Sequence, residues 1–195
     1  TESKEDFCFN VWKLYKCNSA ANGGLMRTSI VATSPMVEEE EIANICRLTH
    51  PDMRCIGSCV LYVRLIQDLI FNNTQLDISA LKDIADRYDS HINEYIDLAT
   101  NENPTVLSLD DNTMGYTLKT ISVALWSLWH CNSFKDGLLS VVNLGGDADT
   151  NAAVSCALLG AKYGFSNIPQ YYVDNLQNKQ IIEDIYKNTV LDLDE

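Results

Sequence analysis

Residues 145–161 read GGDADTNAAVSCALLGA, and this stretch decides the fold. Its second part, residues 152–161, is so rich in small and aliphatic side chains that we expect a helix buried on nearly every side. Asp147, Asp149 and Thr150 stand at the start of that helix. Carboxylate and hydroxyl oxygens are hard ligands, so their place at the mouth of a buried helix suggests a divalent metal site for Mg²⁺ or Mn²⁺.

A glycine pair precedes these oxygen ligands. Carboxylates two residues apart do not share a face of a regular helix, but Gly145 and Gly146 permit a turn in which they converge. An ordinary helix start is the alternative, because Asp and Thr satisfy free backbone N–H groups and complement the helix dipole there. These side chains do not complete the shell of a pair of ions, so a metal site needs ligands from elsewhere.

The whole chain has 195 residues, of which 46% are hydrophobic, and this suits a single α-helical domain over residues 1–195. We see no long apolar span and no amino-terminal signal pattern, so we expect a cytoplasmic or nuclear protein. The formal net charge of −13 disfavours nucleic acid as a general partner and disfavours a membrane. Seven cysteines, an odd number, indicate reduced thiols, and Cys55 and Cys59 fit core packing better than zinc binding.

Apolar residues repeat at helical spacing along most of the chain and strand alternation is scarce, so the predicted class is all-α. The predicted helices are a core helix over residues 53–71, an amphipathic helix over 78–95, an apolar helix over 118–129 and a short helix ending at Val142. The predicted helix ends are an acidic first turn at residues 38–41, a near capping box at Ser133 and Asp136, a C-cap at Gly164 and a start at Pro169. Residues 192–195 are expected to form a solvated tail.

A glycine-rich loop lies near the beginning of the chain. Residues 18–27 read NSAANGGLMR, and such small residues before an apolar stretch expose backbone N–H groups that suit a phosphate. The alternative is a tight turn with Arg27 in a salt bridge, since glycine-rich loops are common. His50 lies in the segment THPD at residues 49–52 and is a further candidate for the site. The alternative is that it simply caps a helix or makes a hydrogen bond there.

Four short motifs follow one another along the chain: NGGLMR at residues 22–27, THPDMR at 49–54, GYTLKT at 115–120 and GGDADTN at 145–151. Together and in this order they closely resemble the ADP-ribosylglycohydrolase family. The resemblance extends from about Trp12 to Leu176, and the last motif is its most specific element. The shared order of four motifs argues against coincidence.

The resemblance implies a compact multi-helix fold and hydrolysis of the glycosidic bond that links ADP-ribose to a protein side chain or small acceptor. It implies two Mg²⁺ ions as cofactors, with Mn²⁺ as an alternative, and ADP-ribose or an ADP-ribosylated protein as partner. By resemblance, Asp147 and Asp149 are catalytic and ligate metal together with Thr150. The residues implied to bind substrate are Ser19, Asn22, Gly23, Gly24, His50, Gly115, Tyr116, Gly145 and Gly146. Arg27 matches a motif position, or it braces the loop from behind.

The chain departs from the family pattern in its first part. The family carries an earlier Thr-Asp-Asp type metal motif in an amino-terminal helical segment, and nothing upstream of Asn22 matches it. Residues 110–113, DDNT, lie in the wrong order and are expected to form a polar loop. Three explanations stay open: the amino-terminal part was cut away, a separate fragment supplies it, or catalysis was lost.

We therefore expect the carboxyl-terminal part of a cleaved or split ADP-ribosyl hydrolase, with a fold that lacks the amino-terminal helices. The first alternative is a non-catalytic protein of the same fold, either an ADP-ribose binder or a structural protein like the crystallins that resemble this family. The second alternative is an unrelated α-helical interaction domain. Metal binding near Asp147 and Asp149 separates these possibilities.

Overall fold

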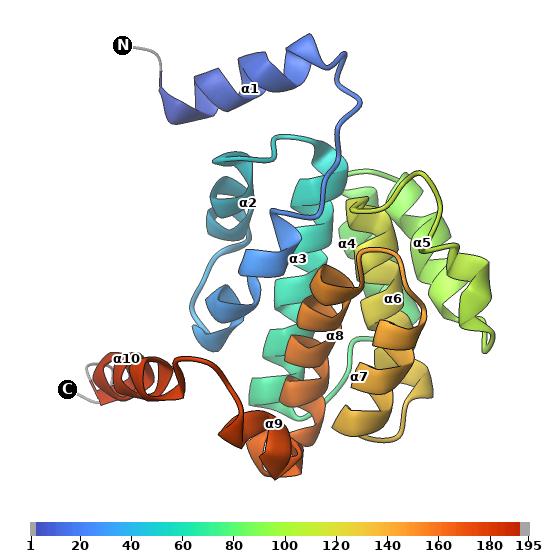
Figure 1. Cartoon of the computed structure of the whole chain (residues 1–195). Coiled ribbons are helices and arrows are strands. Elements are labelled where there is room, and N and C mark those ends of the chain that lie inside the picture. Colours follow the sequence, from blue (N-terminus) through green and yellow to red (C-terminus); the bar gives the residue numbers. More distant parts are fainter. Residues whose placement is uncertain (1–2, 192–195) are drawn as a thin grey trace.

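The structure, a computed structural model, describes residues 3–191, and the regular elements of that part are helices (Figure 1). Its one β-type pairing is an antiparallel bridge between Ala21 and Tyr116. The all-α prediction is therefore confirmed. The helices are α1 (Lys4–Leu14), α2 (Glu39–Arg47), α3 (Met53–Gln67), α4 (Ile78–Asp86), α5 (His91–Ala99), α6 (Thr117–His130), α7 (Phe134–Asn143), α8 (Ala148–Tyr163), α9 (Gln170–Asp174) and α10 (Lys179–Leu191).

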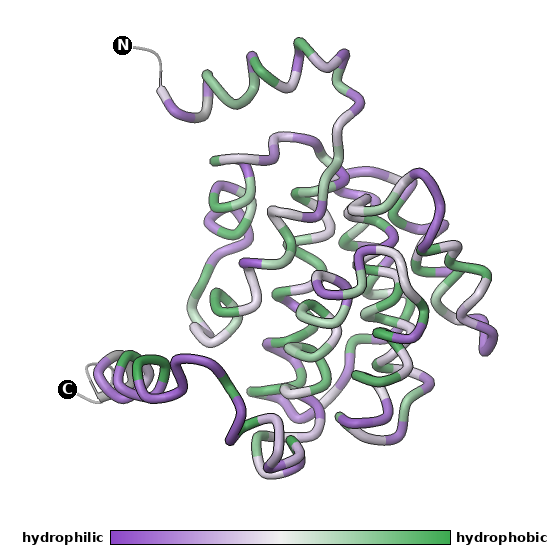
Figure 2. The backbone as a smooth tube through the Cα atoms, in the orientation of Figure 1, coloured by the Kyte–Doolittle hydropathy of each residue, from purple (hydrophilic) through white to green (hydrophobic). Residues whose placement is uncertain are grey.

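Three helices, α3, α6 and α8, lie side by side at the centre of the molecule, and Figure 2 shows hydrophobic residues along them. Most side chains of α3 and α6 are buried. Tyr62 of α3 is fully buried, and its hydroxyl donates a 2.8 Å hydrogen bond to the carbonyl of Val154 in α8. Each fully buried large aliphatic side chain in this core contributes about 1.5–3 kcal/mol. The packing of these three helices and the bond between α3 and α8 thus fix where α6 and α8 begin relative to each other.

Polar side chains and glycine set the helix ends at the predicted places. The acidic residues 39–41 form the first turn of α2. At the start of α7, Ser133 Oγ accepts a 3.1 Å hydrogen bond from the backbone N–H of Asp136. Gly164 ends α8 with a φ of +80°, and Pro169 directly precedes α9. These predictions of helix boundaries are confirmed.

Two predictions about helices are wrong. Residues 78–95 form two helices rather than one, because the chain turns between α4 and α5, where Asp89 Oδ1 accepts the backbone N–H of His91 at 2.9 Å. Both helices bury apolar residues in the same core, so the apolar spacing continues across the break. Helix α8 is not buried on nearly every side: Ala153 is exposed, because α6 and α7 cover chiefly the opposite face of the helix.

Helices α1 and α10 project from the central helices (Figure 1). Helix α1 contacts the rest of the fold through Trp12 and through Cys8, whose thiol donates to the carbonyl of Leu48 at 2.9 Å. On α10, Ile181 and Tyr186 are 59% and 66% exposed. The predicted tail at residues 192–195 lies outside the described residues.

The core helix α3 also tests two predictions about composition. Cys55 and Cys59 are buried in the core, as predicted, and the seven cysteines, which all lie within residues 3–191, are free thiols. The span Met53–Asn72 is long and apolar enough to cross a membrane by length and composition alone. However, 67% of its apolar window is buried inside the fold, which is the behaviour of a core helix.

Candidate active site

Two of the sequence motifs lie side by side at the start of α6. The backbone N–H of Asn22 donates to the carbonyl of Gly115 at 2.8 Å, and the N–H of Thr117 donates to the carbonyl of Ala20 at 2.9 Å. These two bonds enclose the bridge between Ala21 and Tyr116. They fasten the glycine-rich loop to the start of α6.

The side chain of Asn22 connects this loop to a third motif. Its Nδ2 donates to Oδ2 of Asp147 at 2.7 Å and to Oγ1 of Thr120 at 2.9 Å. Asn22 is only 7% exposed although it lies in a loop, and a buried amide requires hydrogen-bond partners. The residue that the resemblance assigns to the diphosphate therefore directs its side chain at a predicted metal ligand, which leaves the loop backbone to contact an anion.

The turn before α8 depends on both predicted glycines. Gly145 and Gly146 have φ values of +74° and +66°, a region that other residues rarely adopt. A Cβ atom on Gly146 would also collide with the backbone carbonyl of Leu109. After this turn, the carbonyl of Asp147 accepts the N–H of Asn151 at 2.9 Å and begins the helix. The glycines shape the turn, while their contact with substrate stays a prediction.

Oxygen atoms at the start of α8 match the chemistry of a hard cation. Asp147 is half-buried and uses Oδ2 for Asn22, whereas Asp149 is exposed and accepts the N–H of Thr150 on Oδ1 at 2.9 Å. Two carboxylates and a hydroxyl suit Mg²⁺. Nowhere in residues 3–191 do three or more His, Cys, Asp or Glu side chains form a group that could hold a metal ion. The described residues thus fit part of a metal site, and further ligands are needed.

His50 lies against the glycine-rich loop. A Cβ atom on Gly23 would lie 3.1 Å from Nε2 of the ring. Nδ1 of the ring lies 2.7 Å from Oγ1 of Thr49, which in turn accepts a 2.6 Å hydrogen bond from Arg27. Arg27 also donates to the carbonyl of Ile45 at 2.9 Å. Arg27 therefore braces this segment from behind, and the alternative of a salt bridge is wrong for the described residues.

The surroundings of His50 set its charge. Burial lowers the pKa of His50, and the positive charge of Arg27 lowers it further, so the ring is neutral at pH 7. Nδ1 shares a hydrogen bond with the Thr49 hydroxyl, whose oxygen also accepts from Arg27. Nε2 is the ring nitrogen that lies beside the loop at Gly23.

A carboxylate and a guanidinium that sequence reasoning did not assign support this site. Arg54 donates from Nε to Oδ1 of Asp52 at 2.9 Å and from Nη2 to Oδ2 at 2.7 Å. The hydrogen bonds that Arg54 donates to Asp52 raise the pKa of Arg54. Nη1 of Arg54 donates to the hydroxyl of Tyr116 at 3.3 Å, and the guanidinium lies 5.6 Å from the centre of that ring. An Asp directly before an apolar helix, followed two residues later by Arg, is the local signal for this pair.

Two cavities adjoin these residues. One of about 400 Å³ is lined by Ser19, Arg54, Gly115 and Tyr116, among others. The second, of about 210 Å³, lies between α1 and His50 and is also lined by Ser19. The structure thus places every predicted site residue around one end of the central helices, with Ser19 between the two cavities.

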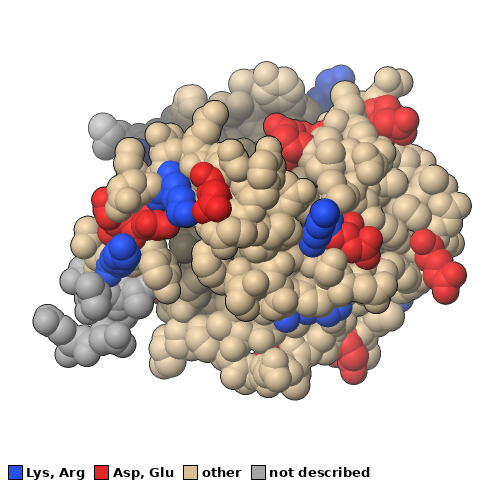
Figure 3. Space-filling model, turned by 60° about the horizontal axis from the view of Figure 1, so that its bottom comes forward, with Lys and Arg blue, Asp and Glu red and all other residues tan. Residues whose placement is uncertain are grey.

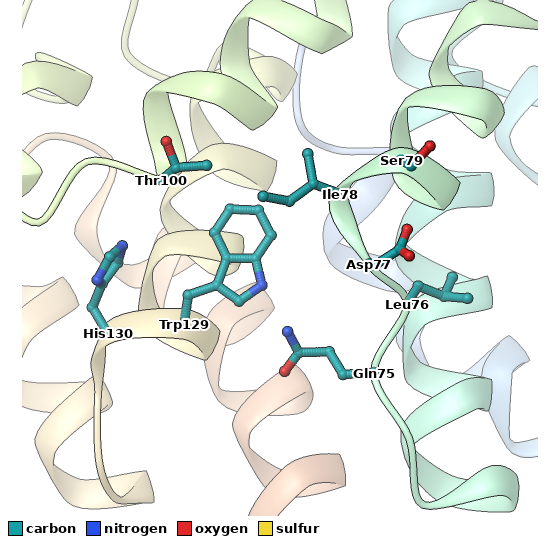
Figure 4. Close-up of a pocket in the computed structure, with 8 residues that line it drawn as sticks. All are labelled: Gln75, Leu76, Asp77, Ile78, Ser79, Thr100, Trp129 and His130. Carbon is teal, nitrogen blue, oxygen red and sulfur yellow. The ribbon is translucent and has the colours of Figure 1, made fainter.

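A larger cavity, of about 680 Å³, lies at the other end of α6 (Figure 4). In Figure 4 the indole of Trp129 lies between the end of α6 and the segment that carries Gln75 and Ile78. None of the predicted site residues lines this cavity. The face drawn in Figure 3 carries acidic and basic side chains in small separate groups, with no broad basic surface in that view.

The helical architecture, with a glycine-rich loop and paired carboxylates gathered at one end of the central helices, defines an all-α protein with a partial oxygen-ligand site. A family model described as ADP-ribosylglycohydrolase matches residues 3–194. The chain belongs to the ADP-ribosylglycohydrolase family, which is generally metal-dependent.

Individual relatives agree with this assignment. The chain is 39% identical over 71 residues to the ADP-ribosylarginine hydrolase Tri1 of Serratia proteamaculans, covering 36% of the chain and 19% of the relative. It is 26% identical over 174 residues to the ADP-ribosyl-[dinitrogen reductase] glycohydrolase of Rhodospirillum rubrum, covering 85% of the chain and 53% of the relative. The chain thus spans about half or less of the length of these relatives.

A solved structure, an ADP-ribosylglycohydrolase-related protein complex, has the same fold. The TM-score is 0.68 at 20% sequence identity, and the match covers 94% of this chain and 72% of the other. At that identity the likeness concerns the fold alone.

Proposed function

We propose that the chain is the carboxyl-terminal part of a Mg²⁺-dependent ADP-ribosyl hydrolase, which cleaves the glycosidic bond between ADP-ribose and an acceptor. The observation that carries this proposal is the 2.7 Å hydrogen bond between Asn22 and Asp147. It joins the loop assigned to the diphosphate with the turn assigned to the metal. The name of the Serratia relative makes ADP-ribosylated arginine the first substrate to test.

In this proposal the start of α8 holds Mg²⁺ through carboxylate oxygens of Asp147 and Asp149 and the hydroxyl of Thr150. When bound there, Mg²⁺ would supply Lewis acidity and a water molecule of lowered pKa. The backbone N–H groups of the loop at residues 22–24 bind the diphosphate. The proposal places the ring proton of His50 on Nε2, which donates a hydrogen bond to the diphosphate. A neutral ring makes this bond without a counter-ion.

The cavity of about 400 Å³ receives the distal ribose. Tyr116 forms one wall of it, and Gly115 leaves room beside that wall because it has no side chain. Arg54 and Asp52 hold the Tyr116 ring in place through the bonds described above. A rigid wall matters here, because a substrate must be positioned to within a fraction of an ångström for efficient reaction.

We further propose that a separate amino-terminal fragment of the same fold supplies the remaining metal ligands. The incomplete set of oxygen ligands at the start of α8 supports this proposal, because the described residues fit only part of a metal site. The partly uncovered face of α8 supports it too, since a cavity of about 680 Å³ lined by Ile30, Ile70 and Gly160 lies on that side. Native mass spectrometry of the purified material tests it: a second polypeptide bound at equal stoichiometry is expected, and its absence from fully active material would overturn the idea.

Release of ADP-ribose from an ADP-ribosylated arginine peptide, with Mg²⁺ and with any co-purifying fragment, tests the main proposal. We expect turnover that EDTA abolishes and that Asp149→Asn removes with little change in thermal unfolding. Asp83→Asn, an equal change at an exposed position away from the site, should keep full activity. If the protein binds ADP-ribose without any turnover, the hydrolase proposal is wrong and the protein is a non-catalytic binder. If it binds neither Mg²⁺ nor ADP-ribose, a structural role is left.

A further inference from the structure

A buried relay of three polar side chains lies behind the carboxylate of Asp147. Thr120, in the first turn of α6, accepts a 2.9 Å hydrogen bond from Nδ2 of Asn22 and donates a 3.0 Å hydrogen bond to Oδ1 of Asn151. The three residues are only 7%, 1% and 3% exposed, in the order Asn22, Thr120, Asn151. They belong to the glycine-rich loop, to α6 and to α8, so the relay connects these three elements.

The direction of each hydrogen bond is fixed by chemistry. Oδ1 of Asn151 can only accept, so the hydroxyl hydrogen of Thr120 points to it. The Thr120 oxygen must then accept from Asn22, and this orients the Asn22 amide with its nitrogen inward. The second hydrogen of that nitrogen points to Oδ2 of Asp147. The opposite orientation of the Asn22 amide would set its oxygen against Oδ2 of Asp147, so the carboxylate excludes it.

We propose that Thr120 is a positioning residue that acts through Asn22 to hold the Asp147 carboxylate in a single orientation. Oδ2 is engaged by the amide, and in this proposal Oδ1 is the oxygen that would bind the metal. The proposal rests on the function proposed above, in which Asp147 ligates Mg²⁺. Residues that orient a metal ligand in this way typically change metal affinity 10–100-fold when they are replaced.

The position of Asp147 explains why such a support is needed. The residue follows two glycines whose backbone has many accessible conformations, and its side chain is only half-buried. The hydrogen bond from Asn22 restricts the carboxylate before any ligand arrives. Asn22 alone is in a loop, but Thr120 and Asn151 sit on rigid core helices, and they transfer that rigidity to the carboxylate.

The test compares Thr120→Val, which keeps the shape and removes the hydroxyl, with Thr120→Ser, which keeps the hydroxyl. NMR spectroscopy of the labelled protein without metal gives two readouts: the exchange rate of the Asn22 side-chain amide hydrogens and the χ1 couplings of Asp147. In Thr120→Val we expect exchange at least tenfold faster and averaged couplings. In Thr120→Ser we expect both readouts to stay close to those of the unmodified chain.

Ser127→Ala is the matched control for stability. Ser127 is a second buried hydroxyl of α6, and it donates to the carbonyl of Ala124 rather than to the site. This variant should lose stability comparable to that lost by Thr120→Val without moving either readout. Unchanged exchange and a single Asp147 rotamer in Thr120→Val would overturn the proposal, as would an equal change in Ser127→Ala. Both readouts are independent of ADP-ribose, so failure of the hydrolase assay leaves this result standing on its own.

Discussion

Replacing Asp52 by Asn removes the negative partner of the ion pair that holds the Tyr116 wall, and it also alters the oxygen that accepts from Nε1 of Trp12 at 3.3 Å. Asp52 is 3% exposed and accepts hydrogen bonds from the backbone N–H, Nε and Nη2 of Arg54. Asn keeps the helix cap, because Asn and Asp cap equally well, but its amide nitrogen would face a guanidinium donor. Removing one partner of a buried pair costs about 3–5 kcal/mol. The Arg54 side chain is 19% exposed, so we expect the lower end, about 3 kcal/mol.

Urea unfolding of four proteins measures this effect: the unmodified chain, Asp52→Asn, Arg54→Met and the double variant. The double variant should lose less than the sum of the single losses by about 1 kcal/mol or more, because it removes the unpaired charge. Asp83→Asn is the control for an exposed carboxylate. A loss below about 0.5 kcal/mol in Asp52→Asn, the size of an ordinary surface change, would refute the reasoning.

Gly146→Ala should lower the free energy of unfolding, measured in urea, by about 2 kcal/mol or more. Gly160 has open space around it inside α8, so Gly160→Ala should be neutral or stabilising. Equal losses in the two variants would contradict the role of the turn. The folded-state pKa of His50 lies below its ordinary value of 6.5, so the unfolded chain takes up the proton first and stability falls as the pH drops below 6.5. Urea midpoints at about pH 7.5 and 5.5 measure this decline, and in His50→Gln the part due to His50 should be absent. An identical decline in His50→Gln and the unmodified chain would contradict the pKa shift. Tyr62→Phe should cost about 1 kcal/mol through its lost bond to α8, while Tyr171→Phe, 72% exposed, should cost nothing measurable in the same assay.

Local patterns were sufficient for the elements that build the core. Helices α3 and α6 carry apolar residues all along the predicted spans, and their length leaves no other element type. The turn between α4 and α5 escaped prediction because Ile84 and Ile92 both enter the same core and keep the spacing regular. The partial exposure of α8 escaped for a related reason, since alanine and glycine tolerate solvent and core equally.

The site was predictable as a set of motifs and not as a geometry. Asn22 and Asp147 are 125 residues apart, and neither local sequence indicates that they touch. Only the order of the motifs, through the family resemblance, placed them in one site. Thr120 carried no signal of its own, because a single threonine in an apolar helix commonly bonds back to its own backbone. Its role depends on two partners that come from other elements.

The distance along the chain between Asn22 and Asp147 also has a consequence during synthesis. At about 5–20 residues per second, a ribosome needs roughly 6–25 s to advance from one residue to the other. For most of that interval the Asn22 amide has neither of its partners in the folded site, because Thr120 follows only 98 residues after Asn22. The site therefore forms late in biosynthesis, after α3 and α6 have emerged, and a nascent chain that stops before α8 carries the glycine-rich loop without its carboxylates.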